Sequence, residues 1–95
     1  MEFTLINPPS APPRRITWSF KGIQIFNSIG DAENTNGDYV DRISVNKTTA
    51  SLELRDLTEN DTGLYTVSIS IILGGVPQQE TTLLTVLGMY FLYIH

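Results

Sequence analysis

The sequence contains no cysteine in its 95 residues, and its only histidine is the last residue, His95. Without cysteine the chain cannot form a disulfide, a thiolate nucleophile or a cysteine-ligated zinc site. A single terminal histidine also leaves little material for general acid–base catalysis. We therefore expect no enzymatic activity, no cofactor and no metal, and we expect core packing alone to stabilise the fold.

Basic residues are also few, with six lysines and arginines against ten acidic residues and a net charge of −4. They are scattered, so the sequence offers no basic patch for nucleic acid or an anionic membrane surface. The apolar run from Val86 to Ile94 is much shorter than the about 20 residues that a membrane-spanning helix needs. No secretory signal pattern opens the chain. We therefore expect no nucleic-acid partner, and we do not expect these 95 residues to insert into a membrane.

Polar and apolar residues alternate along most of the chain, whereas no long stretch has apolar residues at helical spacing. The alternation predicts strands at 15–20, 23–26, 42–45, 50–57, 64–70 and 80–87. Lys21-Gly22 predicts a hairpin turn, and 28–38 predicts a polar loop with at most a short edge strand. The expected inward residues are Leu52, Leu54, Leu57, Tyr65, Val67, Ile69, Leu84 and Val86. Short strands separated by such turns predict an antiparallel β-sandwich.

The run Asp61-Thr62-Gly63-Leu64-Tyr65 is the most specific motif. In immunoglobulin sandwiches a corner tyrosine lies two residues before the second disulfide cysteine, and an inward tryptophan packs against the disulfide. Val67 stands at that cysteine position, and Trp18 matches the tryptophan. Counting back about a dozen residues from Trp18 reaches Ile6 or Leu5 as the first cysteine position. We expect these aliphatic side chains to pack on Trp18 in place of the disulfide.

At these residues the chain resembles variable-type immunoglobulin domains, and more closely the N-terminal domains of the carcinoembryonic-antigen-related cell adhesion molecules. The matching residues are Ile16-Thr17-Trp18, Arg42, Ala50-Ser51-Leu52-Glu53-Leu54 and Asn60-Asp61-Thr62-Gly63-Leu64-Tyr65-Thr66-Val67. The resemblance extends from about Phe3 to Val86, and that family's first domains also lack the disulfide. It implies an ion pair between Arg42 and Asp61. Leukocyte receptors of the lymphocyte adhesion type are similar too, around Tyr65 to Ile69.

The resemblance implies an all-β, V-set-like sandwich of Greek-key topology without an intersheet disulfide, over residues 3–87. An apolar tail over 88–95 follows. Only Met1 and Glu2 precede Phe3, so strand A of such domains is expected to be missing, which would leave the next strand with an unpaired edge. Either Met89 to Ile94 or a neighbouring molecule is expected to cover that edge. Otherwise the tail extends the last strand or is an appended segment.

Such domains bind through the face of strands G, F, C and C′ or through end loops. Alternation places outward the residues Arg15, Thr17, Ser19, Thr66, Ser68, Ser70, Thr81, Leu83 and Thr85. The loop Ile71-Ile72-Leu73-Gly74-Gly75-Val76-Pro77 is apolar for a hairpin tip, so it either contacts a partner or packs on Ile23, Ile25 and Phe26. An ordinary solvated sheet surface is the plain alternative for the whole face.

The resemblance implies a cell-surface or secreted recognition domain that mediates cell adhesion. The expected partner is the same or a related immunoglobulin-domain receptor. The expected contact is homophilic, so a homodimer is one of the expected forms. Sequons at Asn46 and Asn60 predict glycosylation. A leukocyte-type receptor ectodomain with a different ligand and a purely structural immunoglobulin module are the alternatives. A sialic-acid lectin of this fold would need an outward arginine among Thr66, Ser68 and Ser70, so we do not expect one.

Overall fold

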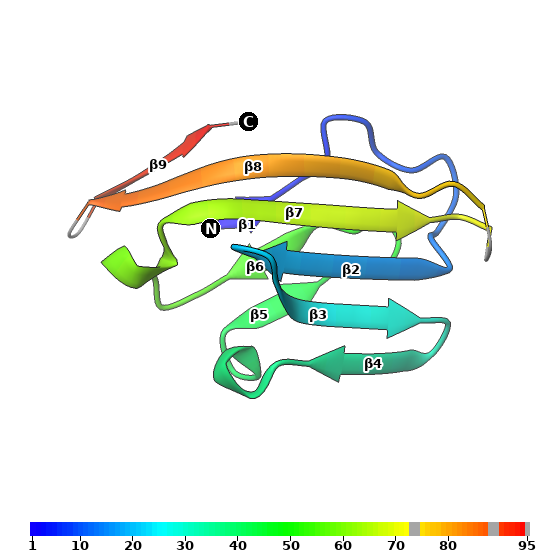
Figure 1. Cartoon of the computed structure of the whole chain (residues 1–95), viewed down its shortest axis with the longest axis horizontal. Helices are drawn as coiled ribbons and strands as arrows, with labels where there is room; N and C mark the ends of the chain where they lie inside the picture. Colours follow the sequence, from blue (N-terminus) through cyan, green and yellow to red (C-terminus); the bar gives the residue numbers. More distant parts are fainter. Residues whose placement is uncertain (73–74, 88–89, 95) are drawn as a thin grey trace.

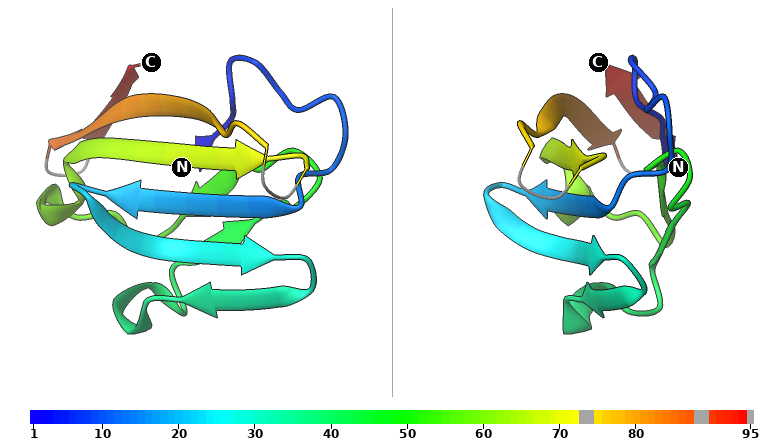
Figure 2. Two further views of the ribbon diagram at one scale, coloured as in Figure 1. Left: turned by 45° about the vertical axis from the view of Figure 1, so that its right-hand side comes forward. Right: turned by 90° about the vertical axis from the view of Figure 1, so that its right-hand side faces the viewer.

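The computed structural model describes residues 1–72, 75–87 and 90–94, and these form two antiparallel sheets that pack face to face (Figure 1; Figure 2). The larger sheet has the strand order β4-β3-β2-β7-β8-β9, and the smaller sheet has the order β1-β6-β5. Among the described residues, no helix has the length and apolarity to cross a membrane.

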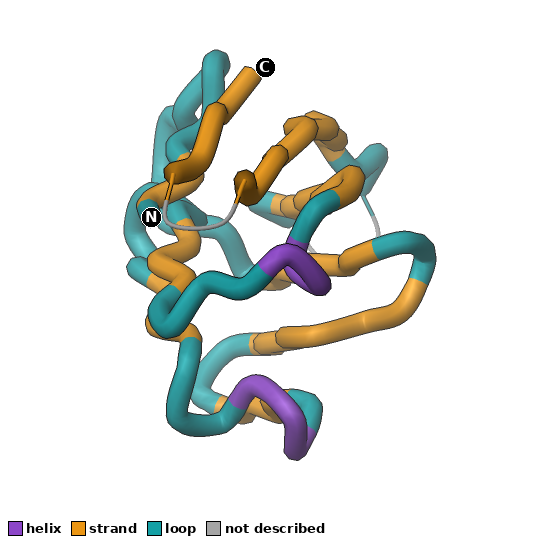
Figure 3. The backbone as a smooth tube through the Cα atoms, turned by 90° about the vertical axis from the view of Figure 1, so that its left-hand side faces the viewer, coloured by secondary structure: helices purple, strands orange, loops and turns teal. Residues whose placement is uncertain are grey.

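The chain passes back and forth between the two sheets, because β1, β5 and β6 belong to the smaller sheet and the strands between and after them belong to the larger sheet. Their bounds are β1 (Glu2–Phe3), β2 (Arg15–Phe20), β3 (Ile23–Ile29), β4 (Ala32–Thr35), β5 (Ile43–Val45), β6 (Leu52–Leu54), β7 (Gly63–Ser70), β8 (Gln78–Leu87) and β9 (Tyr90–Ile94). Two single-turn 3-10 helices, η1 (Gly37–Tyr39) and η2 (Glu59–Asp61), lie at the same end of the sandwich (Figure 3). The predicted all-β antiparallel architecture is confirmed.

The β2–β3 hairpin forms where the sequence predicts it, with Lys21 and Gly22 at positive φ in the turn. The strand after this turn is longer than expected, because it continues through Ser28 and Ile29 instead of ending in a loop. A tight turn at Gly30 then leads into the predicted edge strand, β4. The pairing register of β2 and β3 shifts after Trp18, which lets the consecutive residues Ile25 and Phe26 both be buried.

Aromatic side chains from both sheets fill the centre of the core. Phe3 of the smaller sheet packs against Trp18 and Tyr65 of the larger sheet, with ring centroids 5.9 and 4.9 Å away. The Trp18 indole N–H donates to the carbonyl oxygen of Ala50 at 2.9 Å, so its polar atom is paired inside the core. The expected inward residues Leu52, Leu54, Tyr65, Val67, Ile69, Leu84 and Val86 are all buried. Leu57 is only partly buried, because it lies beyond the end of β6.

The expectation that Ile6 packs on Trp18 at the first cysteine position is wrong. Ile6 is 63% exposed, and Phe3 makes the contact with Trp18 instead, while Leu5 is partly buried at the edge of the core. Residue counting failed because the chain between β1 and β2 is an irregular connection containing four of the five prolines, and not a strand followed by a short turn. Phe3 of the smaller sheet and Val67 of the larger sheet are both buried, so the core around Trp18 is packed without a disulfide.

Polar contacts stabilise the corner that precedes β7. Arg42 and Asp61 form the ion pair that the resemblance implies, with Nη2 and Oδ2 2.6 Å apart. The Tyr65 hydroxyl donates to the Asp61 carbonyl oxygen at 2.7 Å. Burial, and then the negative charge of Asp61, raise the pKa of Tyr65 above its ordinary value. Gly63 has φ of +150°, and a Cβ there would lie 2.8 Å from the Phe20 ring, so this motif position requires glycine.

The two ends of the chain lie on different sheets. β1 pairs with β6 only and forms one edge of the smaller sheet. Tyr90–Ile94 pairs with Leu83–Leu87 of β8 and extends the larger sheet, so the expectation that it covers the edge of β1 is wrong. Met89 lies outside the described residues.

Candidate interaction face

The outer face, meaning the surface of the larger sheet turned away from the smaller sheet, carries the predicted partner-binding residues. Pairing sets them in rows across the strands, because Thr17 lies opposite Ser68 and Thr66 lies opposite Thr81. The Thr66 and Thr81 hydroxyl oxygens are 3.2 Å apart. In β7 and β8, accessible and buried residues alternate. Thr66, Thr81 and Leu83 are accessible, and the residues that adjoin them along β7 and between Thr81 and Leu83 in β8 are buried. The predicted orientation of these strands is therefore confirmed.

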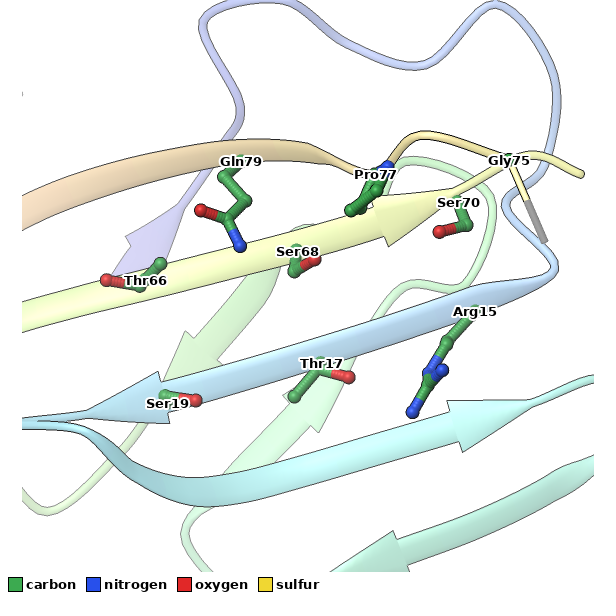
Figure 4. A pocket seen from close by; sticks show the side chains of 9 residues that line it. All are labelled: Arg15, Thr17, Ser19, Thr66, Ser68, Ser70, Gly75, Pro77 and Gln79. Carbon is green, nitrogen blue, oxygen red and sulfur yellow. The ribbon is translucent and has the colours of Figure 1, made fainter. Parts of the chain in front are cut away.

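A groove of about 410 Å³ runs along this face over β2, β7 and the start of β8 (Figure 4). Its lining residues are Arg15, Thr17, Ser19, Thr66, Ser68, Ser70, Gly75, Pro77 and Gln79. Six of these nine residues are predicted site residues, and their side chains carry hydroxyl groups or, in Arg15, a guanidinium group. The groove therefore presents hydrogen-bonding groups on a rigid sheet, as a recognition surface does.

Arg15 is the charged residue of this groove. It is the first residue of β2 and is exposed, and its side chain runs toward β3 in Figure 4, with Thr17 beside it. The Thr17 hydroxyl donates to the Asn27 side-chain oxygen at 2.8 Å, which adds an amide from β3 to the same surface. The acidic groups of neighbouring strands are engaged elsewhere. Glu33 pairs with Lys47 at 2.7 Å, and Glu80 accepts the backbone N–H groups of Ile6 and Asn7.

The loop after β7 exposes apolar side chains, whereas the strands of the outer face expose mainly polar ones. Ile72 is 73% exposed and Val76 is 96% exposed, and Leu73 lies outside the described residues. The expectation that this loop packs on Ile23, Ile25 and Phe26 is wrong. Ile23 pairs with Phe20 at one end of the β2–β3 hairpin, whereas the loop follows Ser70, which pairs with Arg15 at the opposite end of β2. Ile71 and Ile72 line a separate hollow of about 230 Å³ beneath the loop, with Ile69, Gly75, Val76 and Gln78.

The sequence pattern missed one lining residue, Gln79, and one neighbour of the groove, Asn27. Gln79 is two residues before Thr81, so extending the alternation of β8 back by one step would have placed it outward. Asn27 could have been found if β3 had been extended past Phe26. Gly75 and Pro77 belong to the loop that the sequence singles out as a candidate contact, but no sequence pattern indicates that they line this groove.

Both sequons lie away from the groove. Asn46 is exposed in the turn between β5 and β6, where its side-chain oxygen accepts the backbone N–H groups of Thr48 and Thr49 at 2.9 and 3.3 Å. Asn60 is exposed in η2. Neither residue is among those that line the groove on the outer face. Glycans at these two sites would therefore leave the groove open.

The fold and these positions define an immunoglobulin domain of the variable type. The sequence model of the family described as immunoglobulin V-set domain matches residues 4–87, and the chain belongs to this family. No curated protein sequence is similar enough to the chain to count as a relative.

Two solved structures share the fold at low sequence identity. The CD2-binding domain of CD58 (lymphocyte function-associated antigen 3) superposes with a TM-score of 0.69 and 15% identity, covering 83% of this chain and 44% of that chain. The first immunoglobulin-like domain of human CD48 antigen gives 0.74 and 11%, covering 85% of this chain and 68% of that one. The chain thus spans less than half the length of the CD58 chain.

Proposed function

We propose that the chain is the recognition domain of a cell-surface or secreted adhesion protein and binds a protein partner through its outer face. The groove of about 410 Å³ is the observation that carries this proposal, because it gathers hydrogen-bonding side chains from three strands on an accessible surface. Membership of the V-set family supports a binding role over catalysis. The CD58 structure is described as a CD2-binding domain, which also supports a protein partner for a domain of this shape.

The partner takes one of two forms. The resemblance to the N-terminal domains of the carcinoembryonic-antigen-related molecules implies contact between two copies of the chain. The alternative is a different immunoglobulin-domain ligand, as the resemblance to leukocyte receptors implies. The single cation of the groove, Arg15, bears on this choice and favours the second form.

Binding to cells and self-association together test the proposal. The glycosylated chain is presented as a fluorescent tetramer to cells, and its association in solution is measured by analytical ultracentrifugation over rising concentration. Ser68→Arg places a large cation in the groove and is expected to abolish binding in either assay. Ser10→Arg makes the same substitution in the exposed connection between β1 and β2 and is expected to leave binding unchanged.

The results separate the two forms of partner. Association that rises with concentration and is lost in Ser68→Arg would identify a second copy as the partner. A monomer that still binds cells through the face would identify a different protein. Binding that is equal in Ser68→Arg and the unmodified chain would overturn the assignment of the outer face.

A further inference from the structure

We propose that Arg15 receives a carboxylate from an acidic side chain of the partner, and that the partner is therefore a different protein and not a second copy of this chain. This inference rests on the proposed function and names the chemistry of its partner. It concerns the end of the groove where β2 begins.

The guanidinium group of Arg15 has no partner among the described residues. Within the part of the chain that the structure describes, its side chain forms neither a hydrogen bond nor an ion pair. Arg42 binds Asp61, Arg55 binds Glu53 and Lys47 binds Glu33. The exposed Arg14 also has no side-chain partner among the described residues, but it does not line the groove. A guanidinium group offers five N–H donors in a planar fork that fits a carboxylate with two parallel hydrogen bonds.

The residues that line the groove around Arg15 carry no negative charge. The other lining side chains are hydroxyls, the Gln79 amide and Pro77. The two strands that pair with β2, namely β3 and β7, carry no carboxylate. One strand further away, Glu33 pairs with Lys47 and both Glu80 oxygens accept backbone N–H groups. The exposed Asp31 in the turn between β3 and β4 does not line the groove. A partner that covers the groove removes Arg15 from water, and this is unfavourable unless the partner supplies the opposite charge.

A second copy supplies that charge poorly. Two outer faces placed against each other bring together two Arg15 side chains and two sets of hydroxyl groups, with no carboxylate from either groove. The fitting partner is a protein surface with an aspartate or glutamate among neutral hydrogen-bonding groups. At about 410 Å³ the groove is larger than one carboxylate requires, so the side chain enters with its neighbours along the hydroxyl rows.

The test is a binding screen against purified immunoglobulin-type ectodomains of cell-surface proteins from the same organism, read by surface plasmon resonance. At least one ectodomain is expected to bind. Arg15→Gln is expected to weaken this binding by about tenfold or more, and added salt is expected to weaken the unmodified complex. Arg14→Gln removes the neighbouring exposed arginine, which does not line the groove, and is the matched control. Arg15→Lys keeps the charge without the fork and is expected to rescue binding only in part.

A charge exchange identifies the acidic group. Arg15→Glu combined with arginine at the partner's acidic position is expected to restore binding that each single variant loses. Equal binding by Arg15→Gln and the unmodified chain would overturn the inference but not the proposed function. Self-association through the outer face would have the same two consequences. Loss of binding after sialidase treatment of the partner would assign the carboxylate to a glycan and overturn an acidic side chain. Absence of binding to every ectodomain and to cells would overturn the proposed function itself.

Discussion

Asp61 joins the corner before β7 to Arg42, which lies 19 residues earlier in the sequence. Its carboxylate accepts from Arg42 at 2.6 Å and from the backbone N–H of Thr58 at 2.8 Å, while its carbonyl oxygen accepts from Tyr65. The Asp61 side chain is only 5% exposed, so its removal leaves Arg42 partly buried without its counter-charge. Breaking a pair of this kind is more costly than breaking an exposed one.

We expect Asp61→Asn to lower the free energy of unfolding by about 3 kcal/mol, because the amide keeps the shape of the side chain but not its charge. For a domain of this size that corresponds to a melting temperature lower by about 12–24 °C. Glu53→Gln is the control, since Glu53 forms an ion pair with Arg55 between largely exposed side chains. It should cost less than about 1 kcal/mol. Equal losses in thermal denaturation of the two variants would contradict the structural role of Asp61.

The two tyrosines near this corner predict how stability depends on alkaline pH. Burial and the Asp61 charge raise the pKa of Tyr65, and burial followed by Asp61 raises that of Tyr39. A group whose pKa is higher in the folded state stabilises the fold below the unfolded pKa, and this stabilisation is lost as the pH rises beyond it. The free energy of unfolding should therefore fall above about pH 10, by up to about 1.4 kcal/mol per pH unit for each tyrosine.

Urea denaturation between neutral and strongly alkaline pH measures this slope. Tyr65→Phe removes one titrating group and should make the decline less steep. At neutral pH it should also cost about 1–2 kcal/mol, since the buried carbonyl of Asp61 loses its donor. A decline of the same steepness in the variant would show that Tyr65 does not carry the effect.

At the scale of elements, Glu80 connects β8 to the irregular chain between β1 and β2. Its carboxylate oxygens accept the backbone N–H groups of Ile6 and Asn7 at 2.7 and 2.9 Å, and the Gln78 amide donates to the Asn7 carbonyl oxygen at 2.7 Å. These contacts hold a segment without regular secondary structure beside the start of β8, while β9 pairs with its end. The two features occupy different parts of the same strand.

We expect Glu80→Gln to accelerate amide hydrogen exchange at Ile6 and Asn7, because the amide group can accept only through one oxygen. Exchange along β7 should stay slow, since its backbone pairs with β2 and β8. Glu2→Gln replaces an exposed carboxylate on β1 and is the control. Hydrogen-exchange mass spectrometry measures each segment. Unchanged exchange at Ile6 and Asn7 in Glu80→Gln would contradict the role assigned to this carboxylate.

At the scale of the whole molecule, the sequons and the groove lie on separate surfaces. We expect expression through a secretory pathway to add glycan mass at Asn46 and Asn60, because both are exposed acceptors in N-x-Thr sequences. Asn46→Gln and Asn60→Gln should each remove one glycan. Neither should change binding through the outer face by more than about twofold, since bulky surface glycans act locally. Intact mass measurement shows the glycans, and an unchanged mass of the secreted chain would exclude both sites.

The sequence by itself determined the secondary structure and the orientation of most site residues. Period-two alternation fixes which side of a strand each residue faces, so Thr66, Ser68 and Ser70 could be placed outward and Tyr65, Val67 and Ile69 inward without a structure. The corner motif identified the immunoglobulin class for a similar reason, because Gly63, Asp61 and Tyr65 each meet a local requirement within a few residues of one another.

Only the tertiary structure decided the features that depend on irregular chain paths. Ile6 is exposed and Phe3 fills the core because the proline-rich connection does not follow the spacing of a regular strand. Gly75 and Pro77 line the groove and β9 pairs with β8 instead of covering β1, and no periodicity of the sequence encodes either arrangement. The isolation of Arg15 is of the same kind. The alternating pattern places its side chain outward, but the engagement of Glu33 and Glu80 elsewhere depends on contacts between segments far apart in the chain.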